Sequence, residues 1–157
     1  MKNNKGFTLV ELLAVIVILA VIILIAVNAV IPQMNKAKKN SFIDEVAVYA
    51  QAAEKAYVSD QISDSNPITC FTVGSSGANE LNGNFVKKAD TQYKGKVLLN
   101  SDGSLKKIYL KNKNYMVVAA TQAKVDTKTG DDATANSVKT YKASDWDSTY
   151  AACQTGE

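Results

Sequence analysis

The stretch that decides the fold stands at the N-terminus, where residues 1–32 read MKNNKGFTLVELLAVIVILAVIILIAVNAVIP. A short basic segment is followed by Glu11 and by an apolar run from Leu12 to Val27, and Asn28 is the one polar residue before Ile31. An α-helix over residues 7–31 would be about 37 Å long, which exceeds the roughly 30 Å hydrocarbon core of a membrane. The segment can therefore span a membrane as a helix.

The flanking charges predict the orientation of this helix. Lys2 and Lys5 lie on its N-terminal side. Because basic residues near a span favour the cytoplasmic side, the N-terminus is expected in the cytoplasm and the rest of the chain outside.

Three interpretations of the segment compete. As a secretory signal peptide it would be cut after Ala29, where Val27, Asn28 and Ala29 offer a small-residue site. As a plain uncleaved anchor it would not need Glu11, since an unsatisfied charge in a spanning helix costs up to about 3 kcal/mol. In the third interpretation the helix is retained and Glu11 has a partner.

The residues around Glu11 favour the third interpretation. Residues 5–13, KGFTLVELL, resemble the prepilin cleavage and methylation motif that type IV pilins share with the pseudopilins of type II secretion and competence systems. The resemblance implies that a prepilin peptidase cuts between Gly6 and Phe7, that Phe7 becomes an N-methylated N-terminus, and that Glu11 acts in filament assembly. The apolar run then stays in the mature protein.

A physical argument supports the assembly role of Glu11. A carboxylate in an apolar filament core needs a counter-charge, and the free amine of Phe7 on a neighbouring subunit can supply it. Breaking a buried pair of this kind costs about 3 to 5 kcal/mol. The chain departs from the family in one respect: its proline is Pro32, whereas the family usually carries a helix-bending proline about one turn earlier, near Asn28.

Composition narrows the function classes. The 157 residues suffice for one modest domain and one membrane segment, and the chain has no His. His-dependent hydrolysis is thereby excluded, although a Ser-Lys dyad is not. The net charge of +3 is spread along the chain, so no nucleic acid binding is expected. We expect no enzymatic activity, no cofactor and no metal; the oxygen-rich segment 126–132 is expected to be a hydrated turn rather than a calcium loop.

The predicted domain organisation follows from the pattern of apolar residues. We expect a leader at 1–6, a transmembrane or filament-core helix at 7–32 and an extracellular globular domain at 33–157. Within that domain the pattern predicts an amphipathic helix at 33–60, a connecting loop at 61–93, an antiparallel sheet at 94–121 and a C-terminal loop region at 122–157. The fold class is α+β and pilin-like, with the long helix packed on a sheet of three or four strands.

Several side chains outside the N-terminal motif are candidates for a role. Cys70 and Cys153 either form one disulfide or remain two buried thiols. The lysines at 36, 38 and 39 either contact lipid headgroups or acidic groups of a neighbouring subunit, or form a solvated helix face. Four aromatic residues either pack in the domain or bind a host surface or another filament: Tyr93, Tyr141, Trp146 and Tyr150.

The expected function follows from the motif. The chain is expected to be a structural subunit, a major pilin of an extracellular type IV pilus for adhesion, motility or DNA uptake. A pseudopilin of a secretion or competence system is the alternative, and a secreted or anchored binding domain is the alternative from another class. Its expected partners are the prepilin peptidase, the pilus assembly machinery and further copies of itself. Before assembly it is a single-pass membrane protein, and afterwards it lies on the cell surface.

Overall fold

The computed structural model describes residues 6–63, 67–74, 79–81, 85, 92–121, 138–151 and 153. The chain forms two compact units, Met1–Lys38 and Lys39–Glu157.

The first unit is helical. Helix α1, Leu9–Ser63, begins in this unit and contains Pro32. By length and composition α1 can cross a membrane, and it is the one helix among the described residues that can. Its large apolar side chains from Leu9 to Ile31 are all exposed within the chain. The apolar run therefore finds no partner in its own unit.

In the second unit, one face of α1 forms half of a hydrophobic core. The predicted period of three and four residues holds here, because the buried positions repeat along one stripe. Alanines in this stripe let the sheet approach closely, and aromatic rings fill the wider gaps. Phe42 contacts Tyr93 and Tyr115, and Tyr49 contacts Tyr93. The buried helix residues are Phe42, Ile43, Val46, Tyr49, Ala50, Ala52, Ala53, Ala56 and Tyr57.

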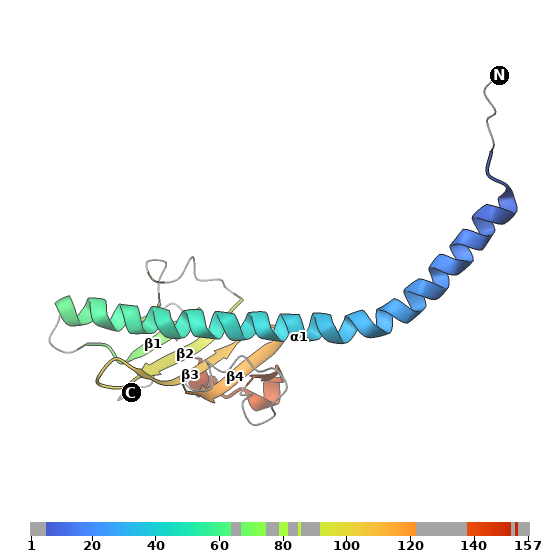
Figure 1. Cartoon of the computed structure of the whole chain (residues 1–157). Coiled ribbons are helices and arrows are strands. Elements are labelled where there is room, and N and C mark those ends of the chain that lie inside the picture. Colours follow the sequence, from blue (N-terminus) through green and yellow to red (C-terminus); the bar gives the residue numbers. More distant parts are fainter. Residues whose placement is uncertain are drawn as a thin grey trace, which may run out of the picture. The chain divides into compact units, whose positions relative to one another are not determined.

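The sheet has five strands in sequence order, each antiparallel to its neighbours. Figure 1 shows β1 to β4 lying along α1. The bounds are β1 Cys70–Val73, β2 Lys94–Leu99, β3 Leu105–Lys111, β4 Tyr115–Ala120 and β5 Val138–Thr140, followed by the 3-10 turns η1 Ala143–Asp145 and η2 Ser148–Tyr150. The predicted α+β class, one long helix on an antiparallel sheet, is confirmed.

The strand count corrects the prediction. Five strands are present where three or four were expected, because β1 lies inside the expected loop 61–93 and β5 inside the expected C-terminal loop region 122–157. All four residues of β1 are buried, so this strand lacks the alternation of a half-buried strand. Strand β5 has three residues, too few to carry a period.

The β2–β3 connection docks the sheet onto the helix. Gly103 adopts φ +83°, a conformation that glycine tolerates best, and its N–H donates to the Asn100 carbonyl over 3.0 Å. A side chain at this position would collide with the Tyr57 ring. The Tyr57 hydroxyl in turn donates to the Ser101 carbonyl. The turn sequence thus fixes both the hairpin and its contact with α1.

Candidate functional site

The expected cleavage point lies directly before the helix. Gly6 and Phe7 are exposed and have no regular secondary structure, and α1 begins two residues after Phe7. The peptide bond between them is therefore in non-helical backbone. The leader residues 1–5 lie outside the described residues.

Glu11 is held by its own chain at the start of the helix. The Thr8 N–H donates to Glu11 Oε2 over 3.0 Å, and the Thr8 hydroxyl donates to the same oxygen over 2.9 Å. In return the Glu11 N–H donates to Thr8 Oγ1 over 3.3 Å. These reciprocal bonds form a capping box, which satisfies backbone N–H groups that the first helical turn leaves without partners.

The capping box gives Glu11 a fixed position. Its carboxylate lies at the positive end of the helix dipole, where a negative charge is stabilised. Thr8 was not among the residues singled out from the sequence, although the spacing Thr-x-x-Glu before an apolar run is the signal of a capping box. Thr8 is therefore the additional residue that the structure brings to this site.

The helix surface after Glu11 is apolar on every side. Each large apolar side chain from Leu9 to Ile31 is between 45% and 80% exposed. Exposed apolar surface of this extent marks a membrane-facing or subunit-facing region, since a water-exposed monomer rarely keeps it.

Asn28 adds a polar side chain to this apolar surface, and Pro32 alters the backbone hydrogen bonding of the helix. The Asn28 side-chain amide donates to the Leu24 carbonyl over 3.3 Å. Pro32 lies one turn later inside α1 and has no N–H to give to the Asn28 carbonyl. The helix therefore lacks one backbone hydrogen bond, between the Asn28 carbonyl and Pro32.

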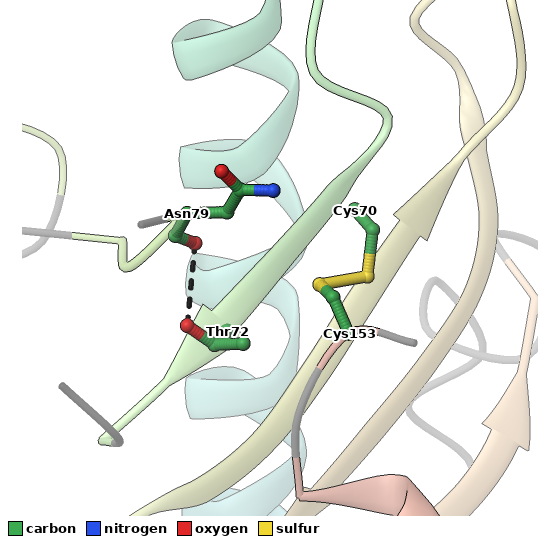
Figure 2. The surroundings of a disulfide bond; sticks show 4 residues. All are labelled: Cys70, Thr72, Asn79 and Cys153. Atoms are coloured by element: carbon green, nitrogen blue, oxygen red, sulfur yellow. Dashed lines mark hydrogen bonds between the residues drawn. A yellow bond between two sulfur atoms is a disulfide. The ribbon is translucent and has the colours of Figure 1, made fainter. Parts of the chain in front are cut away.

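A disulfide ties the end of the chain to the sheet. Cys70 in β1 is bonded to Cys153, with their Cα atoms 5.8 Å apart (Figure 2). Phe71 and Val73 of the same strand belong to the core against α1, so Cys70 and Thr72 point to the opposite, outer face of the sheet. The hydrogen bond from the Thr72 hydroxyl to the Asn79 carbonyl, drawn in Figure 2, lies on the same strand.

Residues 141–151 are held on that outer face by aromatic contacts. Tyr109 of β3 stacks on Tyr150 with ring centroids 4.7 Å apart, and Trp146 meets Tyr150 edge to face at 5.6 Å. Lys111 Nζ lies 4.4 Å from the centroid of the Tyr141 ring and 5.1 Å from that of Trp146. We call residues 138–151 together with Cys153 the C-terminal clamp.

All four aromatic residues that the sequence singled out make packing contacts within the domain. Tyr141, Trp146 and Tyr150 contact the sheet or one another, and Tyr93 packs against the helix. The aromatic residues therefore serve the packing of the domain.

Metal ligands do not gather in the described part of the chain. No group of three or more His, Cys, Asp or Glu side chains there is arranged to hold an ion. The oxygen-rich segment 126–132 lies outside the described residues.

Comparison with known protein families agrees with the N-terminal geometry. Residues 1–27 match the family described as the prokaryotic N-terminal methylation motif. Searches of curated proteins and of solved structures give no significant match to this chain. The matched segment contains the expected cleavage point, the capping box and most of the apolar run, and the chain therefore carries the signature of type IV prepilins and pseudopilins.

Proposed function

We propose that this protein is a structural subunit rather than an enzyme, and that it is a major pilin of an extracellular type IV pilus used for adhesion, motility or DNA uptake. Before assembly it is anchored in the cell membrane by α1. After cleavage its helix leaves the lipid and packs against the helices of other copies.

One observation carries this proposal. The apolar surface of α1 from Leu9 to Ile31 is exposed all round the helix, and it follows directly on the methylation motif. Exposure of so much apolar surface to water is unfavourable, so this helix must be covered by lipid before assembly and by other helices afterwards. A filament core supplies the second environment.

The N-terminal residues suggest how subunits are joined. Cleavage between Gly6 and Phe7 removes Lys2 and Lys5 and creates a new amine on Phe7. The capping box with Thr8 keeps the Glu11 carboxylate at the beginning of the helix. The amine of one subunit and the carboxylate of its neighbour then form a pair inside an apolar core, and loss of one partner costs about 3 to 5 kcal/mol.

The globular unit suits display outside the cell. Its clamp is fixed by Cys70 and Cys153, and disulfides persist in oxidising surroundings. The clamp is also held by the Tyr150 ring, which stacks on Tyr109 of the sheet.

The test compares protein sheared from the cell surface in the wild type, a Glu11→Gln variant and a Glu45→Gln variant. Glu45 lies on the same helix in the globular unit, so Glu45→Gln is the matched control for loss of a carboxylate. We expect Edman sequencing and intact mass to give an N-methylated start at Phe7 in all three. Sheared filaments should fall at least tenfold in Glu11→Gln and stay unchanged in Glu45→Gln.

Other starting residues would contradict the proposal. A start at Val30 would mean that a signal peptidase removes the helix, and a start at Met1 would mean an uncleaved anchor. Filaments assembled equally well by Glu11→Gln would exclude the proposed charge pair.

A further inference from the structure

Lysines follow the apolar run of α1 within two turns. Lys36 and Lys38 are exposed, and Lys39 is half-buried. Lys36 and Lys38 lie outside the residues proposed for cleavage and subunit pairing.

Their distance from the apolar run fits the surface of a membrane. The twenty residues from Leu12 to Ile31 make about 30 Å of helix, the thickness of a hydrocarbon core. Lys36 and Lys38 then lie about 8 Å and 11 Å beyond Ile31 along the axis. The headgroup region is roughly 5 to 8 Å thick on each side, and long lysine stems can bend back toward it. Both ammonium groups can therefore reach lipid headgroups.

The angular positions of the two lysines favour lipid over a single protein partner. At about 100° per residue, Lys36 and Lys38 point about 200° apart, on opposite sides of the helix. One neighbouring helix contacts a stripe along one side, whereas a membrane surface surrounds the helix at one level. A pair of charges on opposite sides matches the second arrangement.

The order of charged residues in the sequence of α1 also favours contact with lipid. The first acidic residues after the run in the sequence are Asp44 and Glu45, which follow Lys36 and Lys38. In the sequence the basic residues thus come directly after the apolar run and before the acidic ones, so the stretch nearest the run is positively charged, as contact with an anionic surface requires.

We propose that Lys36 and Lys38 bind anionic phospholipid headgroups at the outer face of the membrane and so fix the depth of the unassembled subunit. The inference rests on the proposed function, because it requires α1 to remain in the protein as the membrane anchor. When the subunit is extracted into a filament, these contacts are broken.

The test measures lipid selection by the full-length precursor reconstituted in vesicles of phosphatidylcholine. Electron spin resonance gives the relative association of spin-labelled phosphatidylglycerol and spin-labelled phosphatidylcholine with the protein. The test variant is Lys36→Gln with Lys38→Gln. The matched control is Lys106→Gln with Lys107→Gln, which removes two exposed lysines from β3. Lys2 and Lys5 are present in all three proteins, so their contribution to the selection of anionic lipid is the same in each.

We expect the wild type to select the anionic lipid severalfold, with about 30-fold as the upper limit for two lysines at low salt. Selection should fall at least twofold in the test variant, remain unchanged in the control, and weaken in 1 M salt. Equal selection by the test variant and the wild type would overturn the inference. So would unchanged lipid selection accompanied by loss of filaments, because the lysines would then serve a neighbouring subunit.

The two proposals fail separately in these experiments. The lipid measurement uses the uncleaved precursor, so it does not depend on assembly. A wild-type start at Val30 would contradict the proposed function, whereas a start at Phe7 without lipid selection would contradict this inference alone.

Discussion

Removal of the disulfide separates the two means by which the C-terminal clamp is held. The double change Cys70→Ala and Cys153→Ala opens a loop whose ends are 83 residues apart in sequence. In the chain-entropy model, a loop of this length lowers the free energy of unfolding by about 4.5 kcal/mol when it is opened. The aromatic contacts remain, each contributing about 0.5 to 1.5 kcal/mol. We therefore expect a folded but weaker domain, with a loss of about 3 to 5 kcal/mol.

The chain contains its own probe for this measurement. Trp146 is the only tryptophan, and it lies in the clamp against Tyr150. Tryptophan fluorescence therefore reports on the clamp, and far-UV circular dichroism reports on the rest of the domain. Urea unfolding of the full chain in detergent micelles gives both free energies. Wild type treated with a thiol reductant is the control and should show the same loss as the double variant.

Two results would refute this reasoning. A loss below about 1 kcal/mol would mean that the bridge does not restrict the unfolded chain as the loop length requires. Trp146 emission typical of unfolded protein in the variant without urea would mean that the rings do not hold the clamp by themselves.

Three further changes test single features. Thr8→Val removes the capping hydroxyl and should destabilise the first turn of α1 by about 1 kcal/mol, whereas Thr8→Ser should preserve the stability of this turn. Hydrogen exchange measures the effect, because amide protons of the first turn should exchange faster in Thr8→Val. Equal exchange rates in the two variants would argue against the capping box. Gly103→Ala should lower the free energy of unfolding by more than about 1 kcal/mol, measured in urea, because φ is positive and the new methyl meets Tyr57; an unchanged midpoint would contradict this geometry. The Ser104 hydroxyl and N–H donate to Asp102 and hold its pKa below the ordinary value of 3.8. The pKa of Asp102 is therefore lower in the folded protein than in the unfolded chain. The stabilisation that results is present above pH 3.8 and is lost as the pH falls through the lowered pKa. Carboxyl-carbon NMR titration should show this pKa rising toward 3.8 in Ser104→Ala, which removes the hydroxyl and keeps the N–H, and an unchanged pKa would exclude the hydroxyl as its main cause.

The sequence predicts the elements whose signals are local. The helix follows from its periodic apolar residues, β3 follows from its alternation of apolar and polar residues, and β2 and β4 follow from apolar runs bounded by turn sequences such as Asn100 to Gly103. Strand β1 is different, because its place in the sheet depends on pairing Cys70 with Leu98, far along the chain. Local pattern carries no information about such a pairing, so β1 and the short β5 could not be found in this way.

The same contrast between local patterns and contacts of distant residues applies to the candidate site. Gly6, Phe7 and Glu11 follow from a motif of adjacent residues, and Thr8 was readable from its spacing to Glu11. The contacts of Lys111 with Tyr141 and Trp146 join residues 30 and more positions apart, and only the fold brings them together. The choice between display of the rings and packing in the domain therefore required the structure.

The position of the bridge has a mechanical consequence. A pulling force that enters the globular unit through α1 reaches Cys70 soon after the helix ends, and it passes from there directly to Cys153. Without the bridge, the intervening chain could lengthen to roughly 280 Å under load. With the bridge, its two ends stay 5.8 Å apart, so a force applied between α1 and the chain beyond Cys153 does not pull β2 to β5 out of the sheet one after another. A domain pulled in this way keeps the fold of the chain that lies between its two cysteines.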